Sequence, residues 1–284
     1  MPPPNGFRSR FSMVHVHNIS SLDHPALQPY LTMRRQETHR QQRIFVAEGE
    51  TVVRLLLESE LEVVSMLVHQ HWLEKLQPLL ARRRAEEIHV FVAPKAELEQ
   101  LVGYPMYQGL LAIGRIPPAL TLADALKLNS SPRLFVAVDS LGNAENLGSL
   151  VRNCAAFGGQ ALLVGETCSS PWLRRAVRSS MGTIYGLSVV ETVSLASALR
   201  DLRLAGVRCV AAHPHTDQRT LAQADLRGDC CLVFGNEGHG VSPKVLAACD
   251  EAVLIPMANA VDSLNVGSAA AVFLYEVTRQ RGRG

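Results

Sequence analysis

Short apolar runs alternate with helical patterns along most of the chain, and this alternation constrains the fold more than any other feature. In the second half, the runs expected to be strands are residues 134–139, 161–165, 186–191, 207–213, 229–235 and 251–257. Strands separated by helices form mainly parallel sheets with helices on both faces. The second half therefore predicts a mainly parallel six-stranded α/β domain.

The first half shows the same alternation over a shorter length. Strand patterns at 43–49, 61–69, 87–94 and 109–116 flank helical patterns, which indicates a second α/β layer. Residues 1–28 have little periodicity, and residues 117–132 are rich in proline and polar residues. We expect an irregular extension at 1–18, a first domain at 19–116, a linker at 117–132 with one short helix, and a second domain at 133–284.

Three polar segments follow expected strands of the second half, at residues 139–148, 235–240 and 256–265. All three are rich in glycine, asparagine and serine, and ligands of parallel sheets bind beyond the carboxyl ends of the strands. Neither a GxGxxG fingerprint nor a Walker lysine motif is present, which argues against a generic nucleotide-binding enzyme. A binding site at this edge of the sheet is expected.

The last helical pattern begins with small residues, Gly267 to Ala271. A core helix normally presents large apolar side chains early, because these bury the most area. Small residues instead allow close approach of another backbone or of a ligand, and the sequence leaves both open.

Composition excludes some classes of protein. The 28 Lys and Arg against 26 Asp and Glu are too balanced to indicate a nucleic-acid binder, and we expect Arg82–Arg84 on a solvated helix face. The 6 cysteines contain no CxxC pair and are expected to be free thiols of a reducing compartment. No apolar run approaches ~20 residues, and the basic start has no apolar core, so we expect a cytoplasmic protein without a membrane helix or secretory signal.

Three motifs, in order, resemble those of the SpoU family of RNA ribose 2'-O-methyltransferases in the SPOUT superfamily. They are Asn146, Gly148 and Arg152; Gly235, Glu237 and Gly240; and Ile255, Pro256, Met257, Ser263, Leu264, Asn265 and Val266. Residues 174–182 are similar to a family segment between the first two motifs. Residues 19–116 are similar to the ribosomal-protein-like substrate-binding domain fused to many members.

The resemblance implies an S-adenosyl-L-methionine-dependent enzyme that methylates a ribose 2'-hydroxyl of RNA. It also implies a trefoil knot in the second domain and a homodimer. Ribosomal RNA is favoured as substrate over transfer RNA. The remaining alternative is a catalytically silent RNA-binding assembly factor, against which the intact motifs argue.

The reaction requires a positioned base, a group that holds the neighbouring phosphate and a bound donor. The catalytic candidates are Arg152, Asn146, Glu237, Ser263 and Asn265. An arginine stays protonated, so we expect Arg152 to act electrostatically rather than as the base. Each candidate also has an alternative. Arg152 could form a structural ion pair, and Asn146 and Asn265 could be helix N-caps. Glu237 could be a carboxylate in a solvated turn, or it could hold Arg152.

The donor pocket is expected to be built mostly from strand-end backbone and apolar side chains. Its candidates are Gly235, Asn236, Glu237, Ile255, Pro256, Met257, Leu264 and Asn265. RNA-binding candidates are Arg34, Arg35, Arg40, Arg43, Arg174 and Arg178, with Arg175 beside the last two. His213 and His215 lack further ligands for a metal site, and His239 receives no catalytic role.

Overall fold

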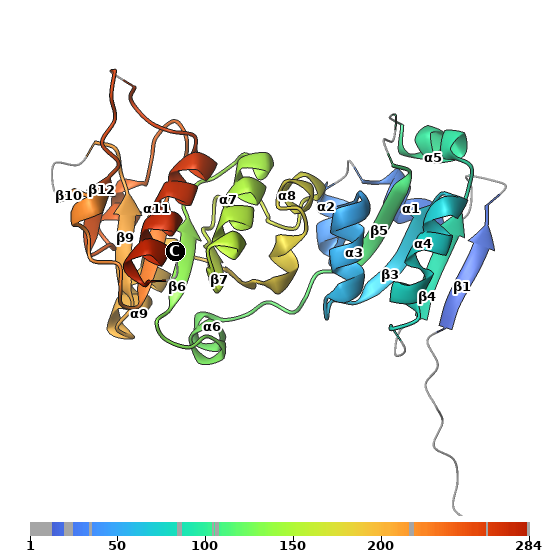
Figure 1. The fold of residues 1–284 in the computed structure, drawn as a ribbon, viewed down its shortest axis with the longest axis horizontal. Coiled ribbons are helices and arrows are strands. Elements are labelled where there is room, and N and C mark those ends of the chain that lie inside the picture. Colours follow the sequence, from blue (N-terminus) through green and yellow to red (C-terminus); the bar gives the residue numbers. More distant parts are fainter. Residues whose placement is uncertain are drawn as a thin grey trace, which may run out of the picture. The chain divides into compact units, whose positions relative to one another are not determined.

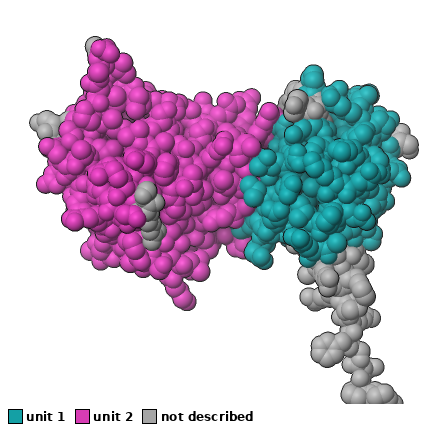
Figure 2. Space-filling view, viewed as in Figure 1, with its two compact units in different colours: residues 1–117 teal, residues 118–284 magenta. Residues whose placement is uncertain are grey.

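The computed structural model describes residues 13–19, 25–33, 36–83, 87–103, 105, 108–215, 219–259 and 261–282. The chain divides into two compact units, residues 1–117 and residues 118–284 (Figure 2). Within the described ranges, no helix combines the length and apolar character that a membrane span requires.

Unit 1 is built on a mixed five-stranded sheet in the order β1-β4-β3-β5-β2 (Figure 1). The strands are β1 (Met13–Asn18), β2 (Ile44–Glu48), β3 (Val63–Val68), β4 (Glu87–Val92) and β5 (Leu110–Arg115). β1 and β3 run parallel to β4, whereas β5 is antiparallel to β2 and β3. The unit is therefore an α/β layer, as the alternation predicted.

Helices cover both faces of this sheet. α3 (Glu50–Glu58) and α4 (Gln70–Leu80) lie along one face (Figure 1). The other face is packed by η1 (Pro25–Leu27), α1 (Gln28–Leu31) and α5 (Lys95–Val102), whose Leu27, Tyr30 and Leu98 share a core with strand residues. α2 (Gln36–Gln41) precedes β2.

One prediction for this unit was wrong. Residues 13–18 were expected to be irregular, yet they form β1, which pairs along its whole length with β4. The segment MVHVHN alternates valine with histidine, so its strand pattern carries only a weak apolar signal.

Unit 2 has a parallel seven-stranded sheet in the order β10-β12-β9-β11-β6-β7-β8. The strands are β6 (Leu134–Val138), β7 (Ala161–Val164), β8 (Ser188–Glu191), β9 (Arg208–Ala212), β10 (Arg219–Thr220), β11 (Cys230–Phe234) and β12 (Glu251–Leu254). The parallel sheet is confirmed, but the expected number of six strands was wrong. The additional strand, β10, has only two residues beside Val253 and Leu254, too few to form a pattern.

Helices pack on both faces of this sheet as well. α7 (Ala144–Ala156), α8 (Arg174–Ser179) and α11 (Val266–Gln280) lie on one side (Figure 1). α6 (Leu122–Leu128), α9 (Leu195–Leu204) and α10 (Pro243–Leu246) share a core on the other through Ala125, Leu199 and Val245. The short helices η2 (Thr183–Gly186) and η3 (Leu221–Gln223) lie in connections.

The small residues at the start of α11 have a structural explanation. A Cβ added to Gly267 would lie 3.2 Å from the Ser149 Cβ of α7. Asn153 Nδ2 of the same helix donates a hydrogen bond to the Gly267 carbonyl at 2.7 Å. Another backbone therefore makes the close approach that the sequence indicated.

Candidate active site

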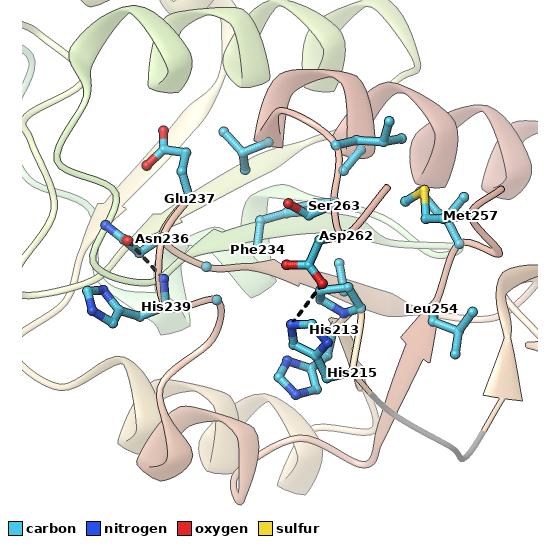
Figure 3. A pocket seen from close by; sticks show the side chains of 18 of the residues that line it. His213, His215, Phe234, Asn236, Glu237, His239, Leu254, Met257, Asp262 and Ser263 are labelled. Atoms are coloured by element: carbon cyan, nitrogen blue, oxygen red, sulfur yellow. Dashed lines mark hydrogen bonds and ion pairs between the residues drawn. The ribbon is translucent and has the colours of Figure 1, made fainter. Parts of the chain in front are cut away.

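A pocket of about 220 Å³ opens at the carboxyl ends of β9, β11 and β12 (Figure 3). Its apolar lining includes Phe234, Leu254, Ile255, Met257, Leu264, Val266 and Phe273. Its polar side chains are His213, His215, Asn236, Glu237, His239, Asp262 and Ser263. An apolar pocket with a few polar groups at the ends of parallel strands is typical of a cofactor site.

The loop after β11 forms one wall of the pocket and is held by Asn236. The Asn236 backbone exchanges two hydrogen bonds with Gly240, of 2.9 and 2.8 Å. Its side chain donates to the Ser140 carbonyl at 3.0 Å and accepts from the N–H groups of Gly238 and His239. A Cβ on Gly235 would lie 2.1 Å from the Gly240 carbonyl carbon, so glycine is required there for the loop to close.

Three side chains from three motifs form a hydrogen-bonded chain beside this pocket. Asn146 Nδ2 of α7 donates to Glu237 Oε1 at 2.5 Å. Asn265 Nδ2 donates to Asn146 Oδ1 at 3.1 Å. Each amide therefore fixes the orientation of the next group, and the chain ends on the carboxylate.

The two asparagines differ in their role at helix ends. The N-cap of α7 is Asn143, whose Oδ1 accepts from the N–H groups of Glu145 and Asn146. The alternative that Asn146 caps this helix was therefore wrong, and its side chain is left for Glu237 and Asn265. The N-cap alternative for Asn265 is confirmed, because its Oδ1 accepts from Gly267 N–H at 2.9 Å.

Arg152 is exposed on α7 and does not line the pocket. It follows Gly148 by one helical turn, and Gly148 packs so closely on α8 that a Cβ there would lie 1.9 Å from Ser179 Oγ. Arg152 therefore lies on the α8 side of α7. Its side chain makes no hydrogen bond or ion pair with any of the described residues, so neither the alternative of a structural ion pair nor a contact with Glu237 is seen there.

The predicted donor-binding residues divide into two groups. Gly235, Asn236, Glu237, Ile255, Met257 and Leu264 line the pocket, as does the catalytic candidate Ser263. Pro256 and Asn265 do not line it, although each adjoins a residue that does. The polar groups of Asn236 are engaged by its own loop and by the Ser140 carbonyl.

The pocket also has a polar wall that motif reasoning missed. His213 and His215 follow β9, and His215 Nε2 lies 3.8 Å from Asp262 Oδ1 (Figure 3). Burial, and then the neighbouring His215, lower the pKa of His213. The position of His213 and His215 after a buried strand was a usable signal, but they were considered only as metal ligands. Across the described ranges, no group of three or more His, Cys, Asp or Glu side chains is placed to hold a metal.

The arginines proposed for RNA differ in their surroundings. Arg34 and Arg35 lie outside the described residues. Arg40 is exposed on α2, and the Arg43 guanidinium donates to the Pro117 carbonyl. A second set, Arg174, Arg175 and Arg178, lies on α8, next to the side of α7 that carries Arg152.

Comparison with known proteins identifies related sequences over most of the chain. The SpoU rRNA Methylase family matches residues 133–275, and the family RNA 2'-O ribose methyltransferase substrate binding matches residues 46–118. An uncharacterized tRNA/rRNA methyltransferase of Mycobacterium avium is 34% identical over 213 residues, which cover 73% of this chain and 68% of that relative.

Solved structures with the same architecture include an AdoMet complex. The SpoU methyltransferase AviRb from Streptomyces viridochromogenes, in complex with the cofactor AdoMet, has a TM-score of 0.77 and 25% identity over 92% of this chain and 100% of that one. A structure described as an RNA 2'-O ribose methyltransferase has a TM-score of 0.74 and 26% identity, over 95% of this chain and 99% of that one.

Proposed function

We propose that this chain, which belongs to the SpoU rRNA methylase family, methylates a ribose 2'-hydroxyl of ribosomal RNA. The methyl donor is S-adenosyl-L-methionine. The observation that carries this proposal is the hydrogen-bonded chain of Asn265, Asn146 and Glu237. It joins the three family motifs at the rim of a cofactor-sized pocket. A silent RNA-binding protein has no need of such an arrangement.

The pocket residues fit the methyl donor. Phe234, Ile255 and Leu264 offer apolar surface for an adenine ring, and Asp262 and Ser263 bring polar side chains to the same pocket. Pro256 and Asn265 would shape the pocket from behind its lining. When bound, the donor supplies an electrophilic methyl group on a sulfonium sulfur.

Glu237 is the base that we assign to the 2'-hydroxyl. That hydroxyl is a poor nucleophile at neutral pH and loses its proton as it attacks. Asn146 holds Oε1 of Glu237, which directs the carboxylate, and Asn265 fixes the Asn146 amide in turn. In this proposal Ser263, which lines the pocket, orients the acceptor ribose.

Arg152 has the electrostatic role in this proposal. An exposed guanidinium without a partner in the described structure is available to the phosphate beside the target ribose. Arg174 and Arg178 on α8 extend this basic surface, and Arg34, Arg35, Arg40 and Arg43 supply further phosphate contacts from unit 1. Affinity for RNA then comes mainly from these charges, and specificity comes from the folded shape of the RNA.

Three further parts of the proposal concern the whole protein. The crossing of α11 back onto α7, away from its preceding strand β12, supports a knotted carboxyl-terminal segment. Exposed Val272 and Tyr275 on α11 support a homodimer through that helix. The 6 free cysteines support a reducing, cytoplasmic location.

The substrate is tested by methyl transfer from labelled S-adenosyl-L-methionine to unmodified ribosomal and transfer RNA, compared by initial rate. Preferential labelling of ribosomal RNA is the expected result. Preferential labelling of transfer RNA would contradict the substrate but not the reaction. A protein that binds no donor and labels neither RNA would be the silent assembly factor.

A further inference from the structure

The carboxyl end of β6 carries a buried carboxylate that the proposed mechanism does not use. Asp139 is only 5% exposed, and it does not line the pocket. Its Oδ2 accepts a hydrogen bond from Ser242 N–H at 2.7 Å, and its Oδ1 accepts one from Ser140 Oγ at 3.2 Å. A buried carboxylate is costly unless hydrogen bonds replace its lost hydration, so these two bonds hold the Asp139 side chain in one place.

Ser242 is the residue at which the loop after β11, residues 235–242, reaches α10. It is the N-cap of α10, but its own side chain makes no capping hydrogen bond. Asp139 instead binds the N–H of this N-cap, the group that the glutamate of a capping box binds in other helices. The end of the loop is therefore attached to β6.

The start of the same loop is attached to the next residue along the chain, Ser140. Asn236 Nδ2 donates to the Ser140 carbonyl at 3.0 Å. Ser140 has a φ of 55°, a left-handed conformation that is uncommon for serine, and its Oγ lies 2.8 Å from Thr167 Oγ1. Asp139 and Thr167 thus hold Ser140 in this conformation through its hydroxyl, and two consecutive residues of β6 and its end anchor both ends of the loop.

The part of the loop between these two attachments carries the functional groups. Residues 235–240 all line the pocket, and Figure 3 shows Glu237 on this segment. The Asp139 N–H also donates to the Phe234 carbonyl at 2.8 Å, which continues the pairing of β6 with β11 up to the loop. Loss of one attachment would let the segment move relative to Asn146, the α7 side chain that binds Glu237.

We propose that Asp139 is a positioning residue, which keeps this loop in the arrangement that binds the methyl donor and places Glu237. The inference rests on the proposed function. Because the pocket lining and Glu237 belong to one loop, donor binding and placement of the base require the same loop position. Bound donor should therefore restore the position that a missing Asp139 carboxylate no longer maintains.

The test compares full-length wild type with Asp139→Ala by calorimetric binding of S-adenosylhomocysteine and by methyl transfer to the RNA that the wild type methylates. The variant should bind S-adenosylhomocysteine about tenfold more weakly and show a similar rise in KM for the donor, because fewer molecules hold the loop in place. Its kcat at saturating donor should stay within about threefold of the wild type. Asp139→Asn keeps an oxygen for Ser242 N–H and an amide for Ser140 Oγ, so it should restore the affinity to within about threefold.

Asp229→Ala is the matched control, because Asp229 makes the same kinds of contact at the opposite edge of this sheet. Its Oδ1 accepts from Arg133 N–H at 2.9 Å, and its Oδ2 accepts from Ser131 Oγ at 2.8 Å and from Arg133 Nη1 at 2.7 Å. It does not line the pocket. Its loss should lower the melting temperature and leave the donor affinity and KM unchanged while the protein is folded.

Three results would overturn the assignment. They are unchanged affinity of Asp139→Ala, equal weakening by Asp229→Ala, and a fall in kcat without a change in affinity. Failure of Asp139→Asn to restore the affinity would also contradict it. If the alanine variant does not fold, Asp139→Ser takes its place, because the serine hydroxyl is one bond shorter than the carboxylate.

Hydrogen exchange separates failure of this inference from failure of the proposed function. Without ligand, the amides of residues 235–242 should exchange faster in Asp139→Ala than in the wild type, and S-adenosylhomocysteine should restore the slower exchange. Equal exchange in the two proteins would refute the role of Asp139. A wild type that binds no S-adenosylhomocysteine would contradict the proposed function itself.

Discussion

Asn265 makes two hydrogen bonds with different purposes. Its Oδ1 caps α11 through Gly267 N–H, and its Nδ2 orients Asn146. Asn265→Ala removes both and should cost about 1 kcal/mol of stability, or roughly 2–4 °C in melting temperature, together with most of the activity. Asn265→Asp keeps the capping oxygen but loses the donor. It should therefore melt like the wild type and still show low activity; full activity of the aspartate variant would show that the Asn146 contact is unimportant.

Arg152 is expected to act on the RNA and not on the donor. Arg152→Ala should reduce methyl transfer by roughly 100-fold or more, as expected for loss of a charge that stabilises the transition state. Donor affinity, measured by calorimetry, should stay within about twofold, because Arg152 does not line the pocket. Arg200→Ala, at another exposed arginine on α9, is the control. Undiminished transfer by the Arg152 variant would refute its role.

Site residues were predictable to different degrees. Asn146, Glu237 and Asn265 belong to motifs, so their candidacy came from the sequence, but only the fold shows that they bond to one another. The capping role of Asn143 was missed because the segment 143–146 offers two asparagines, and cap geometry depends on where the helix begins. His213 and Asp262 lie far apart in the sequence, and no motif joins them.

Among the elements, α7 is the one on which the site depends, because α8 and α11 both pack against it. Gly148 permits the contact with α8: an added Cβ would lie 1.9 Å from Ser179 Oγ and 2.3 Å from the Ala176 carbonyl. Gly148→Ala should cost about 1–3 kcal/mol of unfolding free energy through overpacking. Gly186→Ala, where the added Cβ meets nothing within 4 Å, should change stability by less than about 0.5 kcal/mol. Urea unfolding of both variants checks this, and equal stability would mean that α7 and α8 separate without cost.

Long buried strands were the easiest elements to predict. The runs that became β6, β9 and β11 are apolar on both faces, as parallel strands in a sheet covered on both sides must be. β1 and β10 were missed for opposite reasons. β1 carries histidines where apolar residues are usual, and β10 is held by pairing with β12 over two residues rather than by its own pattern.

At the scale of the whole molecule, each unit has its own core and its own tryptophan. Trp72 is buried in unit 1, and Trp172 is buried in unit 2. Fluorescence of Trp172→Phe therefore reports on unit 1 alone, and fluorescence of Trp72→Phe reports on unit 2. The two-unit organisation followed from the two series of alternating elements, whereas the packing of Ala125 of α6 into the core of unit 2 did not.

His39 gives unit 1 a defined dependence on pH. Burial lowers the pKa of His39, whose Nε2 lies 2.9 Å from the Pro29 carbonyl. The unfolded chain then binds a proton more readily than the folded one, so stability is lost as the pH falls through the ordinary histidine value of about 6.5. The urea midpoint of Trp172→Phe should drop between about pH 7.5 and pH 5.5. His39→Gln in the same background keeps an Nε2 donor and should show a smaller drop; an equal drop would assign the effect elsewhere.

Alkaline digestion of the labelled product shows directly whether the protein methylates the ribose or the base. RNA labelled by the wild type with methyl-labelled S-adenosyl-L-methionine is digested with alkali, which cleaves only beside a free 2'-hydroxyl. We expect the label to be recovered in alkali-resistant dinucleotides. Label recovered in mononucleotides would mean base methylation and would contradict the assignment of Glu237, Asn146 and Asn265 to a ribose acceptor.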